Sequence, residues 1–82
     1  MSIDLIKTKL ENAFPGAQVE VKNTTSMHQS HGSAGLHLKT KIIFDGFKGI
    51  PLIERHRKVY DALEEEMKFI IHALSIEAKY ES

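Results

Sequence analysis

Apolar residues recur at two different spacings along the 82-residue chain, and the changes of spacing divide it into helices and strands. Residues 2–14 repeat apolar side chains every three or four positions, which predicts an amphipathic helix that Pro15-Gly16 ends. Residues 17–22 and 37–44 alternate apolar and polar side chains, so both segments predict half-buried strands. The polar residues 23–36 predict a loop, across which the two strands pair antiparallel.

The helical spacing returns at Leu52 and continues as far as Leu74. One helix of that length would be long for so small a domain, so we expect a break near Leu63–Glu66. A final strand is predicted by the alternating apolar side chains Leu74, Ile76, Ala78 and Tyr80. The predicted order is helix, strand, strand, helix, helix, strand, which is typical of a single α+β domain over residues 1–82.

Composition excludes several function classes. The 11 Lys and Arg residues balance the 11 Asp and Glu residues, so the chain as a whole does not attract nucleic acid or anionic lipid. It has no Cys, and therefore no thiolate of its own for a metal or a cluster. No apolar run approaches the ~20 residues of a membrane span and no signal-peptide pattern is present. We therefore expect a cytoplasmic protein without membrane contact, with an organelle matrix after processing as the alternative location. No catalytic motif is recognisable, so we expect no enzyme.

The stretch FKGIPLIERHRKVY, from Phe47 to Tyr60, concentrates the candidate chemistry. It runs from a Gly-Pro turn into the predicted helix, where Arg55 and Arg57 stand on either side of His56. On a helical wheel His56 lies near the middle of an apolar arc formed by Leu52, Ile53, Val59, Tyr60 and Leu63. The residues alone favour a core histidine whose ring bonds to nearby backbone, with a functional histidine as the alternative.

The segment FKGIPLIERHRKVYDAL resembles the signature of the BolA family, in which a Phe-x-Gly turn leads into a helix carrying Arg-His-Arg, an apolar residue and an aromatic one. The matching residues are Phe47, Gly49, Arg55, His56, Arg57, Val59 and Tyr60. The resemblance extends over about residues 17–80, and its further matches are His28, Ala34-Gly35, His37 and Ile71 to Leu74. It implies a fold similar to class II KH domains, with a three-stranded mixed sheet and helices packed on one face.

The resemblance also implies a role beside monothiol glutaredoxins in the assembly or trafficking of [2Fe-2S] clusters, or in iron regulation. In such complexes a glutaredoxin Cys and a glutathione thiolate hold one side of the cluster, and the BolA-like protein supplies a helix histidine, here His56, and a loop ligand. The chain resembles the histidine type because it has no Cys; His28 matches the loop ligand and His31 is a neighbour able to replace it. We expect a monomer without cofactor when isolated, and a heterodimer with glutaredoxin.

Rival interpretations concern the basic residues and the other histidines. Arg55, Arg57, Lys48 and Lys58 are candidate contacts to the partner or to nucleic acid, although Lys58 also suits a solvated face. Some members of the family are described as transcriptional regulators, so a helix-turn-helix-like DNA contact is the alternative function. Such binding would be weak, because acidic residues follow the basic cluster and the Gly-x-x-Gly clamp of KH domains is absent.

Three further expectations concern histidines. A standalone zinc site formed by His28, His31 and His56 is a third interpretation, since three His and a water form a known catalytic zinc site. We expect His37 to order the start of its strand or to bond the loop. His72 stands in an apolar run, IIHAL, and we expect it to be structural.

Overall fold

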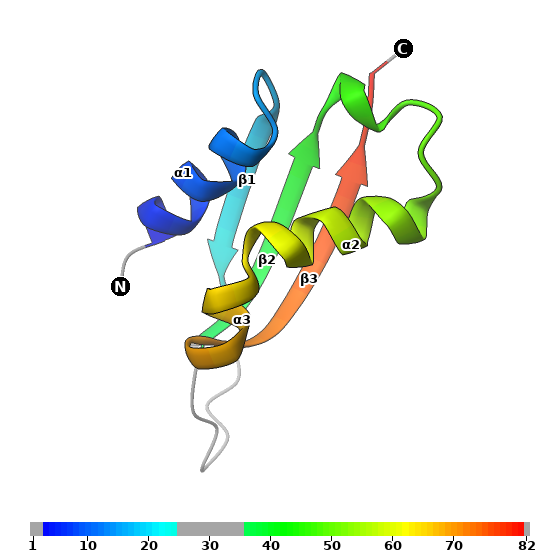
Figure 1. The fold of residues 1–82 in the computed structure, drawn as a ribbon. Coiled ribbons are helices and arrows are strands. Elements are labelled where there is room, and N and C mark those ends of the chain that lie inside the picture. The colour runs from blue at the N-terminus through cyan, green and yellow to red at the C-terminus, as the bar shows by residue number, and fades with distance from the viewer. Residues whose placement is uncertain (1–2, 25–35, 82) are drawn as a thin grey trace.

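A three-stranded sheet carries the fold, and the computed structural model describes residues 3–24 and 36–81 (Figure 1). Its elements are α1 (Ile3–Ala13), β1 (Gln18–Asn23), β2 (Leu36–Ile43), the 3₁₀ helix η2 (Asp45–Phe47), α2 (Leu52–Ala62), α3 (Glu64–Phe69) and β3 (Ile71–Lys79). The predicted α+β order is confirmed. The candidate ligands His28 and His31 lie outside the described residues.

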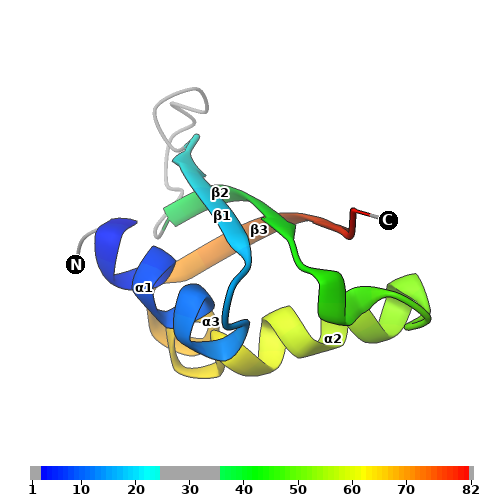
Figure 2. The ribbon, with the colours of Figure 1, turned by 90° about the horizontal axis from the view of Figure 1, so that it is seen from above.

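The sheet is mixed, and its strand order is β1-β2-β3. β1 pairs antiparallel with β2, whereas β2 pairs parallel with β3. Parallel neighbours cannot be joined by a tight hairpin, so the chain crosses over between β2 and β3 through α2 and α3. All three helices lie on the same side of the sheet (Figure 2), which confirms the predicted one-sided arrangement. We call the covered side the helical face and the other side the open face.

The apolar core lies between the helical face and the three helices. Its buried members are Ile6, Leu10, Phe14, Val19, Leu38, Ile42, Phe47, Val59, Leu63, Ile71 and Ala78. The rings of Phe14, Phe44 and Phe47 pack together with centroids 5.2–5.4 Å apart, which joins the end of α1 to η2. The core therefore includes Phe47, the first residue of the FKGIP turn that leads into α2.

Two predicted boundaries in the second half of the chain have different outcomes. The break expected near Leu63–Glu66 is confirmed, because Leu63 separates α2 from α3. The helical spacing read as far as Leu74 is wrong for its last residues, since α3 ends at Phe69 and β3 begins at Ile71. A short apolar run suits a buried helix or a buried strand equally well, and here the pairing with β2 makes it a strand.

A buried ion pair connects α1 to α3. The ammonium of Lys9 donates a hydrogen bond of 2.6 Å to Oε2 of Glu66, whose side chain is almost fully buried. Burial alone would raise the pKa of the Glu66 carboxyl, but the hydrogen bond and the charge of Lys9 outweigh it and hold that pKa below 4.5. The same hydrogen bond raises the pKa of Lys9 above 10.5. This pair therefore stabilises the folded chain between these two limits of pH.

We expect Glu66→Gln to remove part of the acid sensitivity of folding. Because the pKa of Glu66 is lowered in the folded state, its contribution is complete above pH 4.5 and is lost as the pH falls through the folded value. Urea unfolding on both sides of pH 4.5 should show wild type losing stability more steeply than the variant. Glu11→Gln, which changes an exposed carboxyl of α1, is the control and should keep the wild-type slope. Equal slopes for wild type and Glu66→Gln would contradict the prediction.

Candidate histidine site

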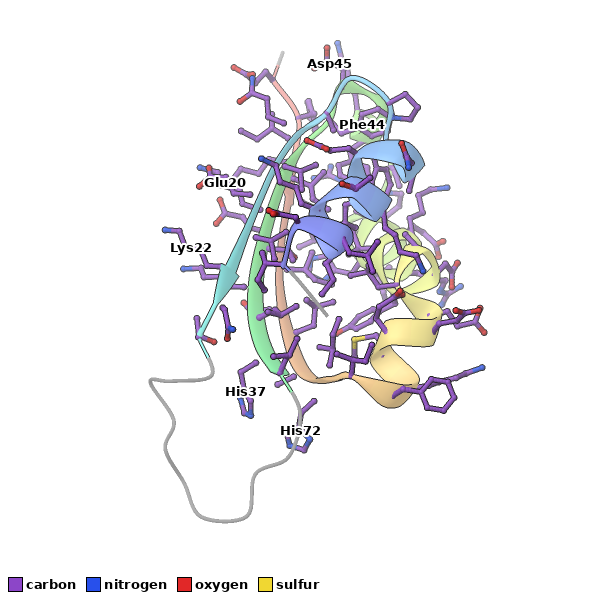
Figure 3. The ribbon with its side chains drawn as sticks, turned by 90° about the vertical axis from the view of Figure 1, so that its left-hand side faces the viewer. Glu20, Lys22, His37, Phe44, Asp45 and His72 are labelled. Carbon is purple, nitrogen blue, oxygen red and sulfur yellow. The ribbon has the colours of Figure 1, made fainter. Side chains whose placement is uncertain are left out.

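Two histidines from neighbouring strands lie together at one end of the sheet (Figure 3). His37 is the second residue of β2 and His72 the second of β3, and their ring centroids are 5.2 Å apart. Leu36 lies opposite Ile71 but His37 lies opposite Ala73, so a bulge inserts His72 between two paired positions. Bulges turn a side chain out of the regular alternation, and this one leaves His72 beside His37. We call these two residues the histidine pair.

His72 does not pack in the core with the apolar run in which it stands, and its predicted structural role stays a prediction. Its side chain is exposed, whereas the preceding Ile71 is buried and supplies the apolar contact that the run predicted. The backbone carbonyl of His37 accepts hydrogen bonds from the amide of Thr24 at 2.8 Å and from its hydroxyl at 3.0 Å. These bonds involve only the backbone of His37, so the predicted role of its side chain in ordering the strand start or bonding the loop stays a prediction. They also hold the residues that flank the segment of His28 and His31 beside the histidine pair.

His56 stands on a different element from the histidine pair. It is the fifth residue of α2, and about 10 Å of helix separate it from Leu63 at a rise of ~1.5 Å per residue. The whole of α3 then follows before the chain reaches His72. Among the described residues, the structure therefore pairs His37 with His72, which the sequence analysis did not connect, and leaves His56 apart from them.

The predicted apolar arc around His56 is only partly right. Val59 and Leu63 are buried, but His56 is half-buried, and the other members of the arc are substantially exposed: Leu52 (56%), Ile53 (70%) and Tyr60 (42%). Leu52, His56 and Tyr60 recur every four residues along the helix, and Leu52 shares its side of the helix with Val59, seven residues later. Leu52 and Tyr60 are nevertheless exposed and His56 is half-buried, whereas Val59 and Leu63 are buried in the core. We call Leu52, Ile53, His56 and Tyr60 the α2 surface.

Arg55 has a structural role that its sequence position did not indicate. Its Nε donates a hydrogen bond of 2.7 Å to the carbonyl of Ile50, and its Nη1 donates one of 3.1 Å to the carbonyl of Ala78. The guanidinium also lies 5.1 Å from the centre of the Tyr80 ring, a cation–π arrangement. Arg55 therefore ties the turn before α2 to the end of β3. No sequence pattern could have found this, because the acceptors are backbone carbonyls.

The other predicted basic contacts point outward. Lys48, Arg57 and Lys58 are exposed, and the guanidinium of Arg57 lies 3.5 Å from the carboxylate of Glu54 on the same helix. In the described chain, Lys48 and Lys58 make no ion pair within 4.0 Å. Their role as contacts to a partner or to nucleic acid stays a prediction.

The described residues do not form a complete metal site. Within residues 3–24 and 36–81, no three His, Cys, Asp or Glu side chains lie close enough to hold a metal ion. The histidine pair supplies two nitrogen donors, and a stable site for zinc or for a cluster needs four ligands on each metal. Any metal bound here would therefore need donors from outside the described part of the chain.

Comparison with known proteins gives consistent results. The family model described as BolA-like protein matches residues 10–82. SufE-like protein 1 of Arabidopsis thaliana is 40% identical over 82 residues, and a protein of Haemophilus influenzae named DNA-binding transcriptional regulator BolA is 32% identical, covering 93% of this chain and 75% of its own. The solved BolA domain of SufE1 from Arabidopsis thaliana has a TM-score of 0.83 at 35% identity, covering 98% of this chain and 94% of that one.

The lengths of the relatives limit what they say about the whole protein. The chain aligns over 90% of its own length with the SufE-like relative but spans only 22% of that protein, and it spans about half of the mouse BolA-like relative. The name of the SufE-like relative describes that protein as chloroplastic/mitochondrial. A cytoplasmic location for this chain therefore stays a prediction. Of the helices described, none is both long enough and apolar enough to cross a membrane.

We expect Arg55→Lys to destabilise the fold by about 1–2 kcal/mol, because a lysine keeps the charge but cannot donate to both carbonyls at once. Arg57→Lys, an exposed change two residues further along α2, is the matched control and should stay within about 0.5 kcal/mol of wild type. Chemical unfolding followed by far-ultraviolet circular dichroism measures both. Wild-type stability in Arg55→Lys would show that the two hydrogen bonds contribute little.

Proposed function

The chain belongs to the BolA-like protein family, and we propose that it is a binding partner which completes a [2Fe-2S] cluster held by a monothiol glutaredoxin with glutathione. The family is one of regulatory and partner proteins, so binding rather than catalysis is the activity proposed. The cluster is cargo shared across an interface. A chain without Cys depends on its partner for the thiolates.

The histidine pair is the observation that supports this proposal. Imidazole replaces thiolate on one iron of the Rieske type of [2Fe-2S] centre, so two histidines are a chemically suitable donor set. Ring centroids 5.2 Å apart are compatible with both imidazoles reaching one metal ion through bonds of about 2 Å. The exposed position of His72 leaves its imidazole accessible to a cluster that arrives on another protein.

The same geometry favours His72 over His56 as the ligand from the second half of the chain. His72 lies on β3 at the end of the sheet where Thr24 and Leu36 flank the segment of the predicted loop ligands His28 and His31. His56 is separated from that end by the rest of α2 and by α3. We therefore propose His72 as one ligand and His28, His31 or His37 as the second. His56 then belongs to a contact surface.

Exposed apolar side chains support contact with another protein. Phe69, the last residue of α3, is 82% exposed and precedes His72 by three positions. Aromatic side chains contribute strongly to protein interfaces, since they bury a large area with little loss of conformational freedom. Phe69 therefore offers an anchor for the partner at the end of the sheet that carries His72.

We expect the visible absorption and circular dichroism of a cluster-loaded monothiol glutaredoxin with glutathione to change when this protein is added. His72→Ala should abolish the change, because it removes a proposed ligand without touching the core. His56→Ala is the matched control, a second imidazole removed from a different element. At saturating protein it should leave the changed spectrum intact, because a contact residue affects the affinity but not the ligands of the cluster. His28→Ala, His31→Ala and His37→Ala, measured in the same way, identify the second ligand.

Two results would count against this assignment. An unchanged spectrum with wild-type protein would exclude a shared cluster altogether. If His56→Ala abolished the spectral change and His72→Ala retained it, the ligand would be His56, as the sequence predicted.

Binding to DNA is the second candidate function, because the Haemophilus influenzae relative is named as a DNA-binding regulator. Lys48, Arg57 and Lys58 are the exposed basic residues available on and before α2. Two observations weigh against strong binding. Arg57 already lies near Glu54, and the exposed part of the α2 surface is largely apolar, which suits a protein contact better than phosphates. We therefore keep DNA binding as the weaker proposal.

If DNA binding contributes, its affinity should fall steeply with salt, since each phosphate contact releases bound counterions. Arg57→Ala should then weaken binding to all duplexes. It should also reduce the slope of log K against log salt concentration by about one, the loss of one phosphate contact. Gel-shift titrations at several salt concentrations measure this, with Lys7→Ala on α1 as the control. The same affinity for wild type and Arg57→Ala would remove α2 from the DNA interface.

A further inference from the structure

The open face of the sheet carries charged side chains in rows that cross the strands. One row runs Glu20–Lys41–Glu77, so Lys41 has a carboxylate on each side. The next row, closer to the histidine pair, runs Lys22–Lys39–Ser75 and contains no acid. The five charged side chains of the two rows line a shallow hollow of about 190 Å³. Figure 3 shows Glu20 and Lys22 pointing away from the helices, on the face that no described helix covers.

Lys22 and Lys39 form a like-charge pair that makes no ion pair with a described acidic residue. They are direct partners in the antiparallel register, where neighbouring side chains of the same charge destabilise a sheet. In the described chain, neither lies within 4.0 Å of an acidic group. The nearby Glu77 already pairs with Lys79, whose ammonium lies 2.6 Å from its carboxylate. The hydrogen bond from Lys79 lowers the pKa of Glu77, and the charges of Lys41 and Lys39 add smaller effects in the same direction.

This like-charge pair adjoins the histidine pair. His37 and Lys39 lie two residues apart on the same face of β2, about 6.6 Å along the strand. A ligand that reaches the imidazole of His37 therefore has two ammonium groups beside it. The two oxygens of one carboxylate match two ammonium donors from adjacent strands, with one oxygen for each.

Resting on the proposed function, we propose that Lys22 and Lys39 form a carboxylate subsite that binds the thiolate-bearing partner complex next to the histidine pair. Glutathione has a carboxylate at each end, and the partner protein presents Asp and Glu side chains, so both sources offer the same chemistry. Binding of a carboxylate removes the repulsion between the two lysines. It also orients the thiolate carrier before the imidazoles are reached.

The test measures the Kd between this protein and the glutathione complex of monothiol glutaredoxin, with and without its cluster, by calorimetry. Lys39→Gln should raise the Kd several-fold and the Lys22→Gln/Lys39→Gln pair roughly tenfold at low salt, with the difference shrinking at high salt. Lys7→Gln, which removes an exposed lysine of α1, is the matched control and should leave the Kd within about twofold. Lys22→Arg/Lys39→Arg keeps the charges and should retain binding.

The outcomes separate this inference from the function on which it rests. The first outcome uses glutathione esterified at its glycine carboxylate. If the ester raises the Kd of wild type but not that of the double Gln variant, the bound carboxylate belongs to glutathione. A rise caused only by the Gln variant assigns it to the partner protein. A Kd unaffected by the Gln changes, while wild type still alters the cluster spectrum, overturns the subsite alone. Loss of DNA affinity in place of partner affinity also overturns it, and an unchanged wild-type spectrum overturns both proposals.

Discussion

The parallel pairing of β2 with β3 is the constraint on which the other features of this small fold depend. Two parallel strands begin at the same end of a sheet, so their second residues, His37 and His72, start beside each other. The chain must then travel the length of the sheet between the strands, and α2 and α3 are that connection. One pairing therefore brings the two histidines together and places His56 on the connecting helix, away from them.

The connection needs to be held in place at both ends, and different interactions do this. At the start of α2, Arg55 bonds the carbonyls of Ile50 and Ala78, so the helix is attached to the last strand. At the other end, the Lys9–Glu66 pair attaches α3 to α1. Each tie combines a charge with hydrogen bonds, so the loss of one member is costly where the other is buried. Apolar packing of Val59 and Leu63 fills the space between them.

Periodicity was sufficient to predict the helices and strands, their order and the α2–α3 break. With one layer of helices on one side of a single sheet, each helix and strand has one apolar side. It failed where tertiary pairing decides the structure. The run IIHAL gives the same apolar signal as a helix or as a strand, so neither the start of β3 nor the bulge at His72 was visible. The structural role of Arg55 could not be predicted for a related reason, since its acceptor at Ala78 lies 23 residues away along the chain.

The positions of the stabilising and the binding residues are physically separate, and the small size of the chain gives a reason. A domain of about this length buries only about 60–65% of its unfolded surface, so its stability margin is small. Imidazoles or ammonium groups placed in the core would lose hydration and would cost stability that such a chain lacks. On the open face and at the sheet end, Lys22, Lys39 and His72 remain exposed to water. The strands, which Leu38 and Ile42 anchor in the core, still fix where these side chains stand.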